Sequence, residues 1–212
     1  ALGRFPMGIQ DFHRFGHTDF DMDLAGRDIA HEAPYVREQM QAWIRWFDKQ
    51  TGVDGYRIDA TKHMDSGFVE GLLYQVQDGM NQSRFAVGEY YDANPGTLQW
   101  WVNSVNRRSS TLDFALKFKL HAMSSGSGFF NMRELENHFK DYEKSVTFVN
   151  NHDFDASRGN GLHTWYNANL AYAFIMANPG YPCIYYPDFF DANGKPRDYL
   201  INLMWVNAKL AH

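Results

Sequence analysis

Helix-type and strand-type patterns alternate along almost the whole chain, and this alternation is the feature that most restricts its fold. Apolar residues at steps of three and four predict helices over 34–49, 66–79, 95–105, 131–140, 167–177 and 198–210. Short runs of β-branched, aromatic and apolar residues predict strands over 53–59, 85–90, 111–116, 145–150 and 183–186. Such alternation predicts parallel strands joined by crossover helices, an α/β fold.

Polar residues follow the first predicted strand, in the stretch Gly52–His63. Arg57 and Asp59 are two residues apart, so on a strand both side chains lie on the same face. Burying a cation and a carboxylate on one face of a strand costs desolvation free energy, so such residues are expected to form an ion pair or to take part in catalysis. Arg57 favours an ionised Asp59, as a nucleophile requires, but for this stretch taken alone a purely structural ion pair is the favoured interpretation.

Two later strands also end in acids, Glu89 and Asp153. Active sites of parallel barrels and open sheets lie at the C-terminal ends of the strands. We therefore predict that Asp59, Glu89 and Asp153 face one cleft. Any one of them alone could be a surface carboxylate, but a chance arrival of all three at such positions is the less favoured explanation.

Composition narrows the possible partners. Aromatic residues make up 17% of the 212 residues, which suits a ring-lined carbohydrate site, although most rings are expected to fill the core. The net charge of −5 and the lack of a basic block argue against a nucleic-acid partner. No apolar run is long enough to span a membrane. Cys183 is the single cysteine, so the compartment stays open, with secretion as the preferred hypothesis.

Residues 1–31 show little periodicity and are predicted to be irregular loop. Their second half carries Asp19, Asp21, Asp23 and Asp28. Carboxylates at this density suit calcium, which prefers oxygen ligands. A solvated acidic loop is the equally supported alternative.

Three motifs resemble conserved blocks of the α-amylase family, glycoside hydrolase family 13. The segment 55–63, Gly-Tyr-Arg-Ile-Asp-Ala-Thr-Lys-His, resembles its second block. Residues 87–90 resemble the third block and residues 148–153 the fourth, in the family's order. The stretch Asp23–Ile29 also looks amylase-like. The resemblance implies a partial TIM barrel, made of the fourth to eighth strands with their helices.

The resemblance also implies roles in a retaining hydrolysis of α-1,4-glucan, as in starch and maltooligosaccharides. Asp59 would be the nucleophile, Glu89 the general acid and then base, and Asp153 a carboxylate that binds sugar hydroxyls in the distorted ring. Glu89 should then have the more raised pKa of the first two. Further expected substrate contacts are Arg57, Lys62, His63, Tyr90 and His152. Trp100 and Trp101 are weaker candidates, because helix packing is the favoured role for both.

A structural calcium ion is the cofactor that the resemblance implies. The family usually takes a backbone carbonyl from the histidine at the position of His63. A carboxylate comes from the loop before the helix, where Asp28 matches best and Asp23 is a second candidate.

The family's first block, with its Asp-x-x-x-Asn-His pattern, is missing from the chain. We therefore expect residues 1–31 to be the remnant of a loop domain (domain B) and residues 32–212 to be a partial catalytic barrel. Five strands cannot close a barrel and leave two open edges, so a homodimer or a complementing fragment is expected. Two alternatives to the endo-hydrolase stay open: an inactive or weakly active carbohydrate-binding fragment, and an exo-acting or transglycosylating relative.

Overall fold

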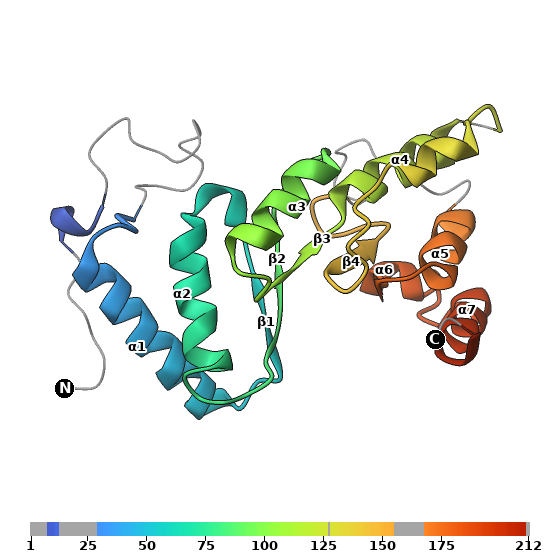
Figure 1. The fold of residues 1–212 in the computed structure, drawn as a ribbon. Helices are drawn as coiled ribbons and strands as arrows, with labels where there is room; N and C mark the ends of the chain where they lie inside the picture. Colours follow the sequence, from blue (N-terminus) through green and yellow to red (C-terminus); the bar gives the residue numbers. More distant parts are fainter. Residues whose placement is uncertain (1–7, 13–28, 127, 155–167, 211–212) are drawn as a thin grey trace. The chain divides into compact units, whose positions relative to one another are not determined.

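The computed structural model describes residues 8–12, 29–126, 128–154 and 168–210 (Figure 1). Within these residues five strands form a sheet in the order β1-β2-β3-β4-β5. The strands are β1 (Gly55–Ile58), β2 (Phe85–Gly88), β3 (Ser110–Leu112), β4 (Ser145–Phe148) and β5 (Tyr181–Cys183). The pairs β1/β2, β3/β4 and β4/β5 are parallel. The predicted α/β class with a parallel sheet is confirmed.

Helices separate the strands along the chain. The α-helices are α1 (Pro34–Thr51), α2 (Ser66–Gln77), α3 (Pro95–Ser104), α4 (Phe114–Ser125), α5 (Ala168–Ala177), α6 (Tyr186–Phe189) and α7 (Asp198–Leu210). The 3-10 helices are η1 (Ile9–Asp11), η2 (Thr61–His63) and η3 (Met132–Glu136). None of the helices in the described ranges combines the length and the apolar character that crossing a membrane requires.

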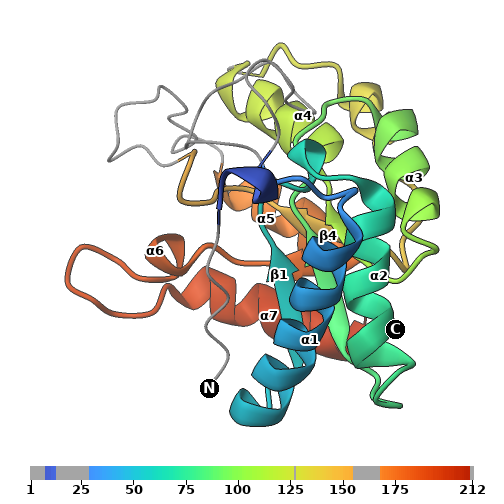
Figure 2. The same ribbon diagram turned by 90° about the vertical axis from the view of Figure 1, so that its left-hand side faces the viewer.

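The chain divides into two compact units, residues 1–91 with 100–110 and residues 92–99 with 111–212. In the first unit α1 and α2 pack side by side, as Figures 1 and 2 both show. Their core contains Ile44, Phe68, Leu72 and Val76. In the second unit α5 packs against α4 and α7, around a core that includes Tyr172 and Ile175.

Helix α1 follows its sequence signals at both ends. Pro34 occupies the first turn, where a missing N–H costs nothing. Gly52 ends the helix in the left-handed conformation with φ of 62°, and its N–H donates to the carbonyl of Asp48 at 2.8 Å. Val36 and Ile44 are buried as their spacing predicts, whereas Trp43 on the same predicted stripe is 46% exposed.

The prediction of a strand over 111–116 is wrong after Leu112. Asp113 is fully buried, and its Oδ1 accepts the N–H of Leu116 at 2.9 Å, so it is the N-cap of α4. The apolar residues that follow Asp113 therefore belong to a helix, α4, and not to the predicted strand.

Most other boundaries agree with the prediction within two residues, and two further elements differ more clearly. The expected helix over 131–140 is reduced to the short η3. The strand expected at 183–186 lies earlier, as β5, because Tyr186 begins α6 with Pro187 in its first turn. The second difference concerns a short apolar and aromatic run, residues 183–186, for which local periodicity does not separate helix from strand.

Candidate active site

Arg57 bridges the two acids that follow β1 and β2. Its Nη1 lies 2.5 Å from Oδ1 of Asp59, and its Nη2 lies 3.1 Å from Oε1 of Glu89. Because Ile58 pairs with Gly88 in the parallel register, the residues after them leave the sheet side by side. The predicted contact between Arg57 and Asp59 is confirmed, and Glu89 joins it.

The two carboxylates have different environments. The side chain of Asp59 is 70% exposed, whereas that of Glu89 is 12% exposed. Burial raises the pKa of the Glu89 carboxyl above its ordinary value. The hydrogen bond from the N–H of Ala60 acts in the opposite direction and lowers this pKa. A hydrogen bond and the negative charge of Asp59 raise this pKa further, while the charge of Arg57 lowers it. The geometry therefore favours a proton on Glu89 beside an accessible Asp59.

The backbone at Ala60 forms a hydrogen bond with the Glu89 carboxyl. Ala60 has φ of 48°, a left-handed conformation that is uncommon outside glycine. In this conformation its N–H donates to Oε2 of Glu89 at 3.2 Å. The N–H of Thr61 donates to the Glu89 carbonyl at 3.0 Å, and the N–H of Glu89 donates to the Ile58 carbonyl at 2.9 Å. Sequence reasoning missed Ala60, because an alanine carries no signal for a positive φ.

Three aromatic rings lie next to the C-terminal end of β2. Trp101 is buried, and a Cβ at position 88 would overlap its ring, which explains the glycine before Glu89. Tyr90 lies 5.7 Å from the ring of Trp101 and 6.4 Å from that of Trp100. Trp101 is thus a packing residue, as favoured above, and Trp100 is 56% exposed.

Lys62 and His63 belong to η2, directly after the turn at Ala60. The Nζ of Lys62 donates to the Tyr91 carbonyl at 3.0 Å and lies 6.0 Å from the centre of the Tyr90 ring. The N–H of His63 donates to the Ala60 carbonyl at 2.9 Å. The structure therefore places Lys62 and Tyr90, two expected substrate contacts, near each other.

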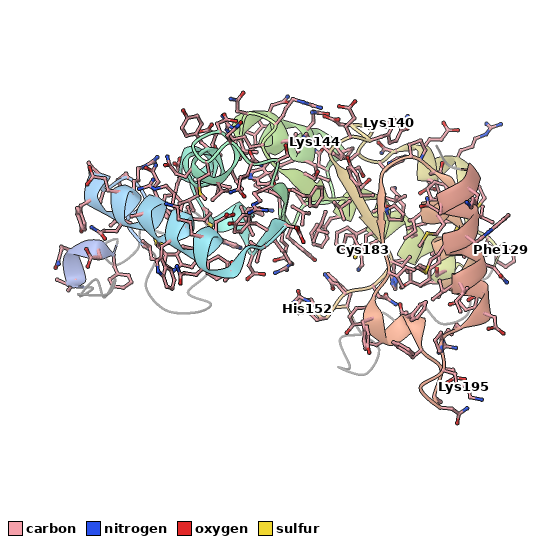
Figure 3. The ribbon with its side chains drawn as sticks, turned by 90° about the horizontal axis from the view of Figure 1, so that it is seen from below. Phe129, Lys140, Lys144, His152, Cys183 and Lys195 are labelled. Carbon is pink, nitrogen blue, oxygen red and sulfur yellow. The ribbon has the colours of Figure 1, made fainter. Side chains whose placement is uncertain are left out.

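His152 and Asp153 belong to the second unit, in the turn after β4. Their side chains are 54% and 52% exposed, and Nε2 of His152 lies 3.5 Å from Oδ2 of Asp153. Figure 3 labels His152, whose ring projects outward from this turn. The convergence of Asp153 with the two acids of the first unit stays a prediction.

Of the expected calcium ligands, Asp23 and Asp28 lie outside the described residues. In the described ranges no three His, Cys, Asp or Glu side chains cluster as a metal site would require. One observation nevertheless fits a nearby cation. Asp11 is fully buried, and by distance and angle its Oδ1 has no hydrogen-bond partner within the described part of the chain, although the Asp11 carboxyl interacts with Tyr35 and raises the pKa of that hydroxyl to about 12. Its carbonyl accepts the N–H of Ala30 at 2.9 Å, two residues after Asp28.

Comparison with known proteins gives one consistent result. The family model described as alpha amylase, catalytic domain, matches residues 21–197. An α-amylase from Bacillus licheniformis is 33% identical over 84% of this chain and 35% of its own length. One from Geobacillus stearothermophilus is 34% identical over 82% of this chain and 32% of its own length. The chain thus spans about a third of the length of these curated relatives.

A solved structure supports the fold. A crystal structure of an α-amylase from Anoxybacillus superposes with a TM-score of 0.73 at 19% identity, covering 95% of this chain and 52% of that one. The parallel sheet with its helices therefore has the fold of part of an α-amylase TIM barrel. Since the family model covers most of the residues, and the fold agrees with it, the chain belongs to the α-amylase family.

Proposed function

We propose that this protein is a retaining glycoside hydrolase that cleaves internal α-1,4-glucosidic bonds of starch and maltooligosaccharides. The observation that carries the proposal is the pair of acids held by Arg57. Asp59 is exposed, while the pKa of the buried Glu89 is raised. Retaining hydrolysis needs one ionised and one protonated carboxyl group in such different environments.

In the proposed reaction, Oδ of Asp59 attacks the anomeric carbon while Glu89 donates its proton to the leaving glycosidic oxygen. Glu89, now a carboxylate, then takes a proton from the water that releases the sugar from Asp59. Through its contact at 2.5 Å, Arg57 favours an ionised Asp59 before the attack and again after the sugar has been released. Retaining enzymes place the two carboxyl groups about 5 to 5.5 Å apart, which leaves no room for an intervening water.

Asp153 and His152 would hydrogen-bond the sugar at the cleavage point, and Asp153 would favour its distorted ring. Both side chains are more than half exposed and so are accessible to a ligand. Lys62, His63 and Tyr90 would line the leaving-group side. In support, Lys62 lies near the Tyr90 ring, directly after the turn that binds Glu89.

Calcium is part of the proposal as a structural ion. The carboxylates of Asp28 and Asp23 and the carbonyl of His63 would hold it. The buried Oδ1 of Asp11, which has no hydrogen-bond partner within the described residues, supports a cation in this region. Bound calcium would supply charge that ties residues 1–31, the proposed loop-domain remnant, to the barrel residues 32–212. It takes no part in the chemical steps described above.

Substitution of the proposed acid tests the function. Glu89→Gln should lower starch hydrolysis, measured as released reducing ends, by about 10²-fold or more. Glu134→Gln is the matched control, because Glu134 forms a surface pair with Lys119 at 3.5 Å. Equal release by wild type and Glu89→Gln would refute the hydrolase and favour a binding role. Product lengths separate internal cleavage from exo-action and transglycosylation, since internal cleavage gives a mixture from the start.

Association is the last part of the proposal. β1 and β5 stand at the two ends of the strand order, and apolar parallel strands are normally covered on both sides. We therefore expect these strands to pair with a second copy or with a complementing segment. Sedimentation equilibrium of the chain by itself should give a dimer mass, and a folded monomer would exclude the homodimer.

A further inference from the structure

The turn Asn151–Phe154 carries the two proposed sugar contacts of the second unit. Oδ1 of Asn151 accepts the N–H of Asp153 at 3.1 Å and that of Phe154 at 3.0 Å, so the turn has a defined local shape. These bonds do not determine where the turn lies on the unit, because both ends of each bond belong to the turn itself. Its position has to come from the residues at its two ends, Asn150 and Phe154.

Asn150 is held by a buried carboxylate. Its Nδ2 donates to Oδ2 of Asp188 at 2.8 Å, and the same oxygen accepts the hydroxyl of Tyr172 at 2.6 Å. Asn150 and Asp188 are 8% and 5% exposed, and Tyr172 is fully buried. Hydrogen bonds to an ionised acceptor in a buried place are short and strong. Asp188 on α6 therefore links the end of β4 to α5.

Phe154 is held by a buried amine. The Nζ of Lys117 on α4 lies 3.3 Å from the centre of the Phe154 ring. The rings of Phe114 and Phe118 meet the same ring edge-on, with centroids at 6.5 and 6.1 Å. These four side chains all belong to the second unit. Phe154 is thus the anchoring side chain at the far end of the turn.

The amine at position 117 is unexpected in this place. Lys117 is fully buried, and its Nζ has no hydrogen-bond partner within the described residues. An amine in such surroundings is costly, whereas a methionine would pack there without this cost. A cation over a ring face is attracted most strongly when both are removed from water. Burial lowers the pKa of Lys117 to about 7, so the amine is protonated in a fraction of the molecules near neutral pH.

We propose that Asp188 and Lys117 are positioning residues, which hold the Asn151–Phe154 turn at its two ends and thereby place the carboxylate of Asp153. Neither residue needs to touch the sugar. The link to Asp153 as a sugar contact rests on the proposed function, whereas the anchoring of the turn does not.

Hydrogen exchange of the Asp153 and Phe154 amides tests the anchoring without any need for turnover. Lys117→Met and Asp188→Ala should each speed this exchange by about tenfold or more, because the turn opens locally. Lys117→Arg and Asp188→Asn should restore most of the protection, since they keep a cation and an acceptor. Lys119→Met is the control on α4, where Lys119 pairs with Glu134, and Asp191→Ala is the control near α6.

Kinetics on maltooligosaccharides then test the consequence for Asp153. Lys117→Met and Asp188→Ala should lower kcat about tenfold or more, with KM changed less than threefold, since misplacement acts mainly on the transition state. Unchanged exchange in both variants, or equal changes in the controls, would overturn the anchoring even if the wild type hydrolyses starch. Faster exchange in a chain without any hydrolysis would support the anchoring and refute the proposed function.

Discussion

The backbone N–H of Ala60 donates to Oε2 of Glu89 at 3.2 Å, and it does so from a left-handed backbone conformation. The turn after β1 thus supplies a hydrogen bond to the proposed acid of β2. This bond favours the carboxylate form, while burial and Asp59 favour the protonated form. The balance between these effects suits a group that must both release and recover a proton.

The backbone at Ala60 predicts opposite effects of two substitutions. Ala60→Gly removes the steric cost of φ at 48° and should leave the free energy of unfolding unchanged or raise it by up to about 1 kcal/mol. Ala60→Val should lower it by about 1 to 3 kcal/mol, because a β-branched side chain fits this conformation poorly. Urea unfolding measures both, and a Val variant as stable as the wild type would contradict the assigned conformation.

Arg57 predicts a shift in the pH profile of hydrolysis. Its positive charge lowers the pKa of Glu89, so Arg57→Met should raise that pKa further. The proposed acid would then stay protonated to higher pH, and the alkaline limb of kcat/KM should move upward. Arg37→Met is the control, because Arg37 forms an exposed pair with Asp65 at 2.7 Å. A downward shift, or the same shift in the control, would contradict Glu89 as the acid.

Lys117 predicts a pH dependence of stability. Its pKa is about 7 in the folded chain and 10.5 ordinarily, so between these pH values the unfolded chain holds more protons. The free energy of unfolding therefore rises with pH across this window. The free energy of global unfolding of Lys117→Met should exceed that of the wild type by on the order of a few kcal/mol at pH 7 and below, while the lost contact with Phe154 opens only the local turn. This advantage should fade towards pH 10.5.

Unfolding measured at several pH values tests this dependence on Lys117, with Lys119→Met as the exposed control on the same helix. A difference between Lys117→Met and wild type that stays constant with pH would show that the amine is charged throughout.

Asp48 and Arg84 predict a contrast between buried and exposed ion pairs. Asp48 is 1% exposed, and Arg84 donates to both of its oxygens at 3.0 Å. Tyr56 adds a third bond at 2.6 Å. Arg84→Met should cost about 3 to 5 kcal/mol, because it leaves a buried carboxylate without its cation. Arg37→Met should cost less than about 1 kcal/mol by the same urea titration, and equal costs would contradict the burial.

Calcium predicts a ligand-dependent melting temperature. Calcium at a hundredfold excess over its Kd should add about 2.7 kcal/mol to the free energy of unfolding of the metal-free chain. Asp28→Asn should reduce this gain, and Asp198→Asn, on α7, should not. Calorimetry with magnesium as the control ion separates a calcium site from general screening, because magnesium fits a larger oxygen cage poorly. Equal gains from both ions would contradict the site.

Much of the fold could be predicted from local pattern. Pro34 and Gly52 bound α1, and the two-residue spacing of Arg57 and Asp59 predicted their contact, although Asp59 lies directly after β1. These signals are local, because they depend on backbone sterics and on the periods of helix and strand. The family membership followed from three motifs that a family model then matched.

What local pattern missed was decided by contacts distant in the sequence. The residues after Asp113 are compatible with a strand as well as a helix. Asp113 stabilises the helix by capping its N-terminus, and its carboxylate also forms hydrogen bonds with His138 and Ser145. The raised pKa of Glu89 comes from its burial beside Asp59, thirty residues earlier in the chain. The proposed acids could thus be named from the sequence, whereas the raised pKa of Glu89 depends on desolvation and neighbouring charge, which exist only once the chain has folded.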